Sequence, residues 1–300
     1  RGQVVNQVTG QAVMGAYVNV QRAGDQIVGL PGYVTGANTD LNGTFELDDV
    51  APGNYALTVQ FQADGKELFG ALKVDPAGGE NLTGMELDIA PGVELSGRVI
   101  LPPNAQLNRD SLTVILKPSN GASLYGGGAR VKEDGTFKLT NVAPGPYRVN
   151  VAGFSEEYYL KSATLNGAEV LASGLTIYPG QPAGTLNLAL SLDGGRINGV
   201  VMNEQKTVDG ATVVLIPNPP FRNRDDLYST KRTDDHGRFA MLGLPPGDYK
   251  LFAWEDLNGE EFKSPDFMRL FENRGQSVHI DAQSSQNVEL QVIPADAMPQ

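Results

Sequence analysis

The sequence predicts an all-β chain of three tandem β-sandwich domains. Short runs rich in β-branched and aromatic residues alternate with clusters of Gly, Pro, Asn and Asp, which is typical of strands joined by turns. A pair of turn motifs recurs three times at constant internal spacing. The 300 residues are enough for three domains of about 100 residues each.

Each repeat is defined by a Gly-x-Phe turn and a following Pro-Gly-x-Tyr turn. The Phe and the Tyr are ten residues apart in all three copies. Three matches of composition and spacing indicate an internal repeat. The motif residues are, copy by copy, Gly43, Phe45, Pro52, Gly53 and Tyr55, then Gly135, Phe137, Pro144, Gly145 and Tyr147, then Gly237, Phe239, Pro246, Gly247 and Tyr249.

The copies are expected to have strands at both of their ends. A glycine and a short β-prone run precede each motif pair, beginning at Gly2, Gly97 and Gly199. A run of alternating apolar residues follows each pair and closes the copy. We therefore divide the chain into a first copy, a second copy and a third copy, at residues 1–92, 93–194 and 195–300.

The motif turns are expected to join strands. Because Gly accepts positive φ at little cost, Asn42-Gly43 and Asp134-Gly135 are predicted to form hairpin turns. In Pro-Gly-x-Tyr, the Pro fixes one turn position and the Gly supplies the next. The Tyr that opens the following strand is predicted to act as the corner tyrosine of a sandwich, whose hydroxyl bonds back to the backbone.

One segment of the third copy predicts a short helix near residues 265–274. It begins with a Ser-Pro cap at Ser264 and ends with a basic last turn and a glycine stop at Gly275. Apolar residues at helical spacing are expected to face the core, and they are Phe267, Leu270 and Phe271.

The combined pattern of Gly-x-Val, Asp-x-x-Gly-x-Phe and Pro-Gly-x-Tyr resembles the carboxypeptidase regulatory-like domain, a transthyretin-like (prealbumin-like) β-sandwich. The resemblance covers all three copies. Residues 158–162 and 249–256 also resemble stretches of multi-domain secreted proteins of acidobacteria and related soil bacteria. The resemblance implies Ig-like Greek-key sandwiches, export from a bacterial cell and no catalytic activity in these modules.

Composition excludes several classes of function. The chain has no Cys, which removes disulfides, thiol nucleophiles and cysteine-based metal sites. With only His236 and His279, no catalytic triad or multi-histidine metal site is expected, and both histidines are expected at the surface. A net charge of −12 argues against a nucleic-acid partner. No apolar run of about 18 residues is present, so no membrane span is predicted.

Two acidic turns are candidates for calcium binding, because hard cations take oxygen ligands. One contains Asp40 and Asn42, and the other contains Asp234 and Asp235. A calcium site needs about six or more oxygens, and the second copy lacks a comparable set. We therefore expect these residues to shape the turns, and we predict no metal and no cofactor.

Adjacent carboxylates are the remaining candidates for catalysis, because paired Asp and Glu act as acid and nucleophile in glycosidases. Neighbours on a strand point to opposite faces, so these residues are expected on a solvated surface. The adjacent carboxylates form the pairs Glu156/Glu157, Glu255/Asp256 and Glu260/Glu261. No catalytic residue is predicted.

Aromatic side chains are the candidates for ligand contact. Tyr158, Tyr159 and Trp254, with Phe262 nearby, are typical of a platform for sugar rings or for a partner protein. The alternative is that they fill the cores or the junctions between domains. The resemblance favours the platform slightly, since related prealbumin-like folds include carbohydrate-binding modules.

The junctions between copies are short. Residues 90–92 join the first two copies, and residues 192–195 join the last two. Because such connections restrict swinging, a stiff rod on the order of 100 Å long is expected. We also expect the chain to be the C-terminal part, or the mature form, of a longer exported protein.

Three functions remain open. The first is a non-enzymatic structural or adhesive rod at the bacterial cell surface or outside the cell, whose partner is a surface protein or glycan. The second is a subunit of an extracellular filament that binds other copies of itself, because sandwich edges can pair between chains. The third is a carbohydrate-binding array, which rests on fold analogy and the aromatic residues.

Overall fold

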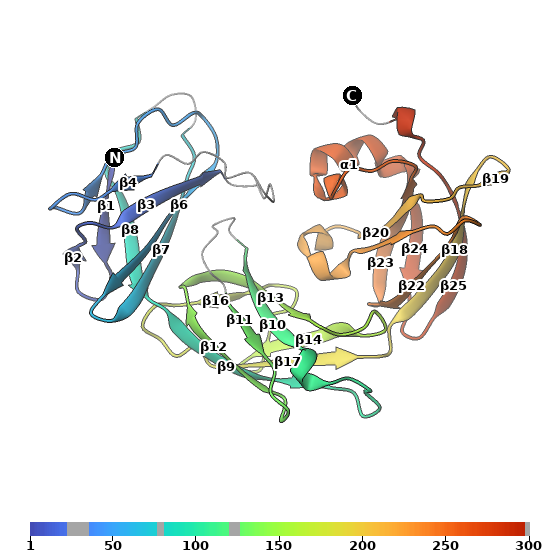
Figure 1. Cartoon of the computed structure of the whole chain (residues 1–300), viewed down its shortest axis with the longest axis horizontal. Coiled ribbons are helices and arrows are strands. Elements are labelled where there is room, and N and C mark those ends of the chain that lie inside the picture. Colours follow the sequence, from blue (N-terminus) through green and yellow to red (C-terminus); the bar gives the residue numbers. More distant parts are fainter. Residues whose placement is uncertain (23–35, 77–80, 120–126, 298–300) are drawn as a thin grey trace. The chain divides into compact units, whose positions relative to one another are not determined.

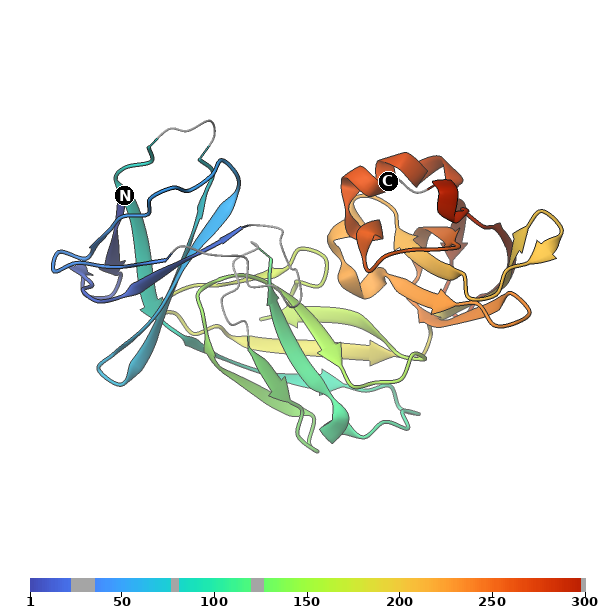
Figure 2. The same ribbon diagram turned by 45° about the horizontal axis from the view of Figure 1, so that its top comes forward.

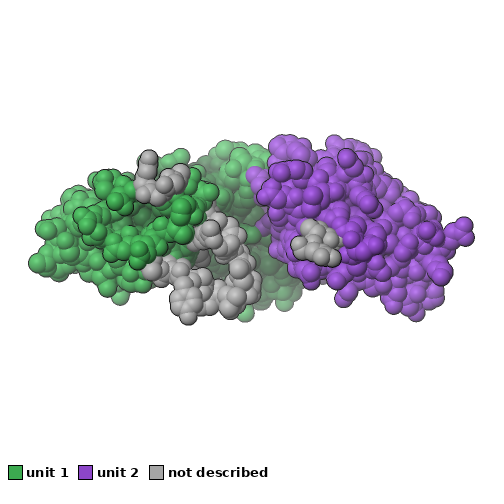
Figure 3. Space-filling model, turned by 90° about the horizontal axis from the view of Figure 1, so that it is seen from above, with its two compact units in different colours: residues 1–99, 107–153, 163–188 green, residues 100–106, 154–162, 189–300 purple. Residues whose placement is uncertain are grey.

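The computed structural model describes residues 1–22, 36–76, 81–119 and 127–297. The chain is mostly β, as predicted, and its described part contains a single short α-helix (Figure 1). It forms two compact units, coloured separately in Figure 3. Unit 1 comprises residues 1–99, 107–153 and 163–188, and unit 2 comprises residues 100–106, 154–162 and 189–300.

The first copy forms an eight-stranded sheet that folds over into two facing layers. The strand order is β2-β1-β8-β7-β6-β3-β4, and β5 also pairs with β1. Val4 and Leu87 from one layer meet Val18 and Leu57 from the other in the core. The strands are β1 (Gly2–Asn6), β2 (Gln11–Ala12), β3 (Tyr17–Arg22), β4 (Ala37–Asn38), β5 (Thr44–Phe45), β6 (Tyr55–Ala63), β7 (Lys66–Val74) and β8 (Met85–Pro91).

The second copy contains a four-stranded sheet, β11-β10-β13-β16, and a five-stranded sheet, β12-β9-β17-β14-β15. Buried and exposed residues alternate along β9, as in a strand with one face on a core. The elements are β9 (Val93–Ile100), η1 (Arg109–Ser111), β10 (Thr113–Pro118), β11 (Gly128–Arg130), β12 (Thr136–Val142), β13 (Gly145–Ala152), β14 (Tyr159–Leu165), β15 (Ala168–Glu169), β16 (Leu175–Ile177) and β17 (Thr185–Ser191).

The third copy contains two four-stranded sheets. In one, β18 pairs with β19, β22 and β25, and the other has the order β21-β20-β23-β24. The strands are β18 (Gly195–Asn203), β19 (Lys206–Thr207), β20 (Thr212–Pro217), β21 (Ser229–Arg232), β22 (Arg238–Leu244), β23 (Gly247–Trp254), β24 (Gln276–Ile280) and β25 (Ser285–Gln291). The helical elements are η2 (Phe221–Asn223), η3 (Asp225–Leu227), η4 (Glu261–Lys263), α1 (Pro265–Phe271), η5 (Glu272–Arg274) and η6 (Ala295–Ala297).

The predicted helix is confirmed as α1, which packs on the β20–β23 face of the third copy (Figure 2). Ser264 caps it, because its Oγ accepts a hydrogen bond from the N–H of Phe267. The predicted buried face is wrong at Leu270, whose exposed fraction is 62%, and Met268 is buried in its place. Within the described residues, no helix has the length and apolar character needed to cross a membrane.

The expected glycine stop after the helix is also corrected. Gly275 has an ordinary φ of −77° rather than a left-handed one. A Cβ at this position would lie 2.4 Å from the ring of Phe252. Glycine is therefore placed here for close packing rather than for a helix-ending turn.

The Gly-x-Phe turns are closed by hairpin backbone bonds, since Gly43 N–H donates to the Asp40 carbonyl and Asp40 N–H donates to the Thr44 carbonyl. The prediction is corrected for the strands on either side, which then pair elsewhere. Among the described strands of the first copy, β4 pairs with β3 while β5 pairs with β1. In the second copy, β11 and β12 belong to different sheets. The turn therefore carries the chain between layers. A side chain supports it, since Asp40 Oδ1 accepts hydrogen bonds from the N–H groups of Asn42 and Thr44.

The Pro-Gly-x-Tyr turns also carry the chain between layers. In the second copy this turn joins β12 to β13, which lie in different sheets. The turn glycines Gly53, Gly145 and Gly247 have φ values of 151°, 148° and 155°. Residues with a Cβ rarely adopt such angles, so the glycine of this motif is required by the backbone.

Candidate functional site

Each motif Phe packs across the glycine that opens its copy. A Cβ on these glycines would lie 2.4–2.6 Å from the aromatic ring, so the ring can cross the strand only at a glycine. The rings are 1–6% exposed. This contact explains why the two sequence elements recur together. The pairs, which are also opposite each other in the sheets, are Gly2 with Phe45, Gly97 with Phe137 and Gly199 with Phe239.

The motif tyrosines differ between copies. Tyr147 donates a hydrogen bond to the carbonyl oxygen of Ala143 at 2.7 Å, and Tyr249 donates to that of Pro245 at 2.9 Å. Both side chains are 1% exposed, and burial raises the pKa of Tyr147 to about 12. Tyr55 is half-buried and makes no such bond among the described residues.

The aromatic platform predicted from the sequence is wrong, because its side chains are buried. Tyr158, Tyr159 and Phe262 are 5–7% exposed, and Trp254 is 0% exposed. Trp254 stacks on Phe252 with ring centroids 5.2 Å apart, in the cluster that α1 covers. Enclosed rings present no face to a sugar or a partner protein.

The acidic turn of the third copy brings three possible metal ligands together. One ligand atom from each of Asp234, Asp235 and His236 lies within 4.8 Å of the others, and all three residues are exposed. Asp234 Oδ1 already accepts two backbone hydrogen bonds, and Asp235 Oδ1 lies 2.5 Å from His236 Nδ1. These groups thus serve the turn and each other, as expected for turn-forming residues.

The other histidine is also exposed. His279 Nδ1 lies 2.6 Å from Asp248 Oδ1 and Nε2 lies 3.4 Å from Asp281 Oδ1. The hydrogen bond with Asp248 raises the pKa of His279 above its ordinary value. The three side chains form a hydrogen-bonded cluster at the surface.

The adjacent carboxylates lie at the surface, as predicted. All six are exposed, and one member of each pair has a structural partner. The partners are Lys231 for Glu156, the N–H of Ala295 for Glu255 and Lys263 for Glu260.

A single residue, Gly92, separates β8 from β9 within unit 1. A Cβ on Gly92 would lie 2.7 Å from Cα of Asn141, so glycine lets the two backbones touch. Gly92 N–H donates to the carbonyl of Glu67, and the Asn141 amide donates to Glu67 Oε2 at 3.2 Å. Phe69 and Ala143 pack together in a small buried cluster. These contacts fix the junction between the first and second copies.

Asp193 lies in the other junction, between β17 and β18, where its backbone carbonyl accepts a hydrogen bond from the N–H of Gln283 in the third copy. Its carboxylate accepts hydrogen bonds from Lys161 at 2.5 Å and from the hydroxyls of Ser191 and Tyr159, both at 2.6 Å. These bonds, led by that of Lys161, hold the pKa of Asp193 well below its ordinary value. Tyr159 thus has a junction role, which was the alternative to the platform.

Gly194 packs against the backbone of the third copy, just as Gly92 packs against the backbone of the second. A Cβ on Gly194 would lie 2.6 Å from the carbonyl carbon of Gly243, and one on Gly243 would lie 2.3 Å from the carbonyl oxygen of Glu156. Asn141 and Gly243 stand at the same repeat position, four residues after the motif Phe, and both have positive φ. These contacts were not predicted from the sequence. The shared repeat position of Asn141 and Gly243 is the sequence signal that could have indicated them.

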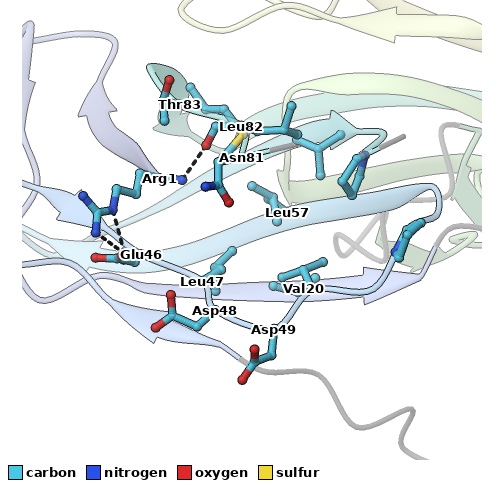
Figure 4. Close-up of a pocket in the computed structure, with 15 residues that line it drawn as sticks. Arg1, Val20, Glu46, Leu47, Asp48, Asp49, Leu57, Asn81, Leu82 and Thr83 are labelled. Carbon is cyan, nitrogen blue, oxygen red and sulfur yellow. Dashed lines mark hydrogen bonds and ion pairs between the residues drawn. The ribbon is translucent and has the colours of Figure 1, made fainter. Parts of the chain in front are cut away.

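A pocket of about 860 Å³ lies in the first copy. Figure 4 shows Leu82 on one side of it, Leu47 and Asp48 on the opposite side, and Leu57 between them. Arg1 also lines the pocket, and its Nε donates to Glu46 at 2.6 Å. The lining of the pocket therefore mixes apolar side chains with charged and polar ones.

Comparison with protein families identifies part of the chain. Residues 1–84 match the family model of the carboxypeptidase regulatory-like domain. This match confirms the predicted resemblance for the first copy. For the second and third copies the resemblance stays a prediction.

A distant relative is the Serine-aspartate repeat-containing protein D of Staphylococcus aureus strain Newman. The two sequences are 26% identical over 149 residues, which cover 44% of this chain and 11% of that protein. The chain thus spans about a tenth of the length of the curated relatives that it matches.

Solved structures with some likeness include bacterial pilins. BcpA, the major pilin subunit of Bacillus cereus, is 11% identical with a TM-score of 0.23, and the match covers 97% of each chain. GBS52, the minor pilin of Streptococcus agalactiae, is 13% identical with a TM-score of 0.31, covering 70% of this chain and all of that one. TM-scores below 0.5 carry no functional role over to this chain.

Proposed function

We propose that the chain is a non-enzymatic spacer, a structural or adhesive rod of β-sandwich domains at the bacterial cell surface or outside the cell. The observation that carries the proposal is the construction of its two junctions. Each is short, and each places a glycine against the backbone of the following copy, at Asn141 and at Gly243.

Side-chain hydrogen bonds support both junctions. The Asn141 amide of the second copy bonds to Glu67 of the first, and Lys231 of the third copy pairs with Glu156 of the second. A connection with such contacts restrains rotation far more than a flexible linker does. A spacer needs a restrained connection, whereas a binding domain on a flexible tether does not. The proposed location rests on the family resemblance.

The test is small-angle scattering combined with negative-stain microscopy of the purified chain. We expect isolated rods on the order of 100 Å with one narrow distribution of lengths. Glu156→Ala, which removes the pair with Lys231, is expected to broaden the distribution, whereas Asp209→Ala, at an exposed position outside the junction, is the matched control. A wild-type chain that already samples many lengths would contradict the rod.

The same images test the filament alternative. Ordered fibres in the wild-type sample would make the chain a polymer subunit rather than an isolated spacer. The carbohydrate-binding alternative is not retained, because the aromatic residues on which it depended are buried.

A further inference from the structure

The last strand of each copy pairs with the first strand, and in the first two copies it has a further strand on its other side. β8 lies between β1 and β7, and β17 lies between β9 and β14. In the third copy β25 pairs with β18, and among the described residues no strand pairs with its outer edge. The third copy thus lacks a partner strand that the other two copies have.

Internal residues of the third copy account for this open edge. In the second copy the segment between β13 and β16 supplies β14, whereas the segment between β23 and β24 forms η4, α1 and η5. The two segments are equivalent, because β16 and β24 both pair with the strand that carries the motif Tyr. α1 packs on Phe252 and Trp254 of the other sheet, and Figure 1 shows it on the opposite side of the third copy from β25. The helical segment therefore covers a face and leaves the edge of β25 uncovered.

The side chains of β25 are less enclosed than those of β17. Leu186 and Val288 are equivalent, because a Cβ on Gly97 would lie 2.0 Å from the former and a Cβ on Gly199 would lie 2.8 Å from the latter. Leu186 is 0% exposed, whereas Val288 is only half-buried. On the other face, two equivalent positions are half-buried in β17 and exposed in β25, and they are Asn187 and Ala189 against Glu289 and Gln291.

The backbone of β25 presents a row of hydrogen-bonding groups at this edge. At one end of the ladder with β18, Arg196 N–H donates to the carbonyl of Ser284. At the other end, Val292 N–H donates to the carbonyl of Met202. Because successive residues of a strand alternate in direction, the even-numbered residues of β25 face β18 and the odd-numbered residues face away. The outward residues are Ser285, Asn287, Glu289 and Gln291.

Other edge strands of the third copy have features that discourage pairing. β22 has an irregular register with β18, and β21 ends with Lys231 and Arg232. In β24 the carbonyl of His279 already accepts a hydrogen bond from the side chain of Gln286. β25 pairs with β18 in unbroken register over seven residues, and Glu289 is its one charged residue. The outer edge of β25 is therefore suited to a further strand.

The partner strands of the first two copies show which direction fits. β7 pairs with β8 antiparallel. Asn166, just after β14, donates its N–H to the carbonyl of Thr185 at the start of β17. Tyr159, at the start of β14, bonds to Asp193 just after β17, so β14 also runs antiparallel to its neighbour. An antiparallel strand therefore fits the edge of β25, and a two-fold axis makes a second β25 antiparallel.

We propose that the outer edge of β25 binds the same edge of a second copy of this chain, with Val288 on the two-fold axis. In this register Asn287 lies opposite Glu289, and Ser285 lies opposite Gln291. Unlike an axis at Glu289, this axis places no like charges directly opposite each other. The interface is symmetric, so it joins two chains and then closes. The proposed spacer does not require this pair, so the inference goes beyond the proposed function.

Sedimentation velocity of the full chain at concentrations up to about 1 mM measures the pairing. Asn287→Pro removes an N–H that faces away from β18, so it costs no bond within the folded copy. We expect the wild type to form dimers and Asn287→Pro to weaken the association about tenfold or more. Asn287→Ala, which keeps the N–H, is the matched control and should still pair. Melting of the dilute chains checks that both variants fold.

Cysteine cross-linking tests the register, since the chain has no Cys of its own. Ser285→Cys and Gln291→Cys chains are mixed and oxidised. The two introduced thiols lie opposite each other across the axis, within the range of a disulfide, so the mixture should give cross-linked dimers. Either variant alone should not, because its two thiols would lie about 20 Å apart along the paired strands.

A wild-type chain that stays monomeric, or Asn287→Pro chains that pair equally well, would overturn the proposal. Cross-linking of either cysteine variant alone would contradict the register. A further arm adds an acetylated peptide with the β14 sequence, Tyr-Leu-Lys-Ser-Ala-Thr-Leu, to the wild type. If the peptide binds while the chain stays monomeric, the edge serves a strand of another molecule, and self-pairing is wrong. The lengths of single Asn287→Pro chains still test the rod, so the two proposals fail independently.

Discussion

The first copy and the two later copies carry the same motif in different surroundings. Tyr147 and Tyr249 are buried and bond back to the backbone, while Tyr55 is half-buried. The strand that follows Gly-x-Phe has seven residues in β12 and in β22 but only two in β5. The motif thus sets the path of the turn in every copy, while the burial of its tyrosine differs between the copies.

The largest expected effect tests what the copies share. Phe45→Ala and Phe137→Ala should each lower the free energy of unfolding by about 3–5 kcal/mol, because both rings are buried across a glycine. Urea denaturation measures it. Unchanged unfolding of Phe137→Ala would remove this residue from the core, and a much smaller effect at Phe45 would extend the difference between copies to the motif Phe.

A glycine substitution tests the same contact from the other side. A Cβ on Gly97 would lie 2.0 Å from the carbonyl oxygen of Leu186 and 2.4 Å from the Phe137 ring. Gly97→Ala is therefore expected to cost about 1–3 kcal/mol. Gly128→Ala is the control, since its nearest neighbours would lie 3.8 Å away. Similar melting temperatures for the two variants would show that the ring does not need the glycine.

Asp193, at the end of the second copy, supplies the next test. Asp193→Asn should cost about 1–2 kcal/mol at pH 7, because a charged acceptor of three hydrogen bonds is lost. The pKa of Asp193 is lowered in the folded state, so its contribution is present above the unfolded pKa of about 4 and is lost as the pH falls through the folded pKa.

The pH dependence supplies the measurement. The difference in unfolding free energy between wild type and Asp193→Asn should be constant from pH 8 to pH 5 and should shrink below about pH 4. Asp209→Asn is the control. A difference that grows in acid would contradict the bonding of this carboxylate.

A smaller effect separates the copies directly. Tyr147→Phe removes a buried hydrogen bond and should cost about 1 kcal/mol, whereas Tyr55→Phe should leave stability unchanged. Chemical denaturation of the two variants side by side measures it. Equal losses would mean that the tyrosine corner forms in the first copy as well.

The smallest effect is expected from chelation. Asp234 is committed to backbone hydrogen bonds of its turn, so EDTA should leave the melting temperature unaltered. The Asp234→Ala variant, which loses those bonds, is the comparison that should melt lower. A large drop with EDTA in the wild type would establish a bound metal.

The fold class could be predicted from the sequence because the repeat consists of residues whose backbone roles are strict. Glycine at a φ near 150° and an aromatic ring across a glycine leave a recognisable spacing. The helix was predictable for the same reason, since Ser264 caps it through a local bond. These elements depend on interactions between residues that are close in the sequence.

The rest depends on contacts between distant residues. The buried state of Trp254 and Tyr159 arises from packing under α1 and from bonding to Asp193, which no local pattern indicates. Leu270 has helical spacing but lies on the exposed side of a helix only two turns long. The pocket was not predictable, because residues far apart in the sequence, from Arg1 to Met85, line it together.

The parallel pairing of terminal strands has a mechanical consequence. β1 and β8 run in the same direction over five residue pairs, and β18 and β25 do so over seven. Tension applied through the chain pulls the start of β18 and the end of β25 in opposite directions along their own axis. The ladder hydrogen bonds then resist shear together, whereas those of a hairpin pulled at its ends would open one after another. A domain built in this way bears force along the chain before any strand detaches.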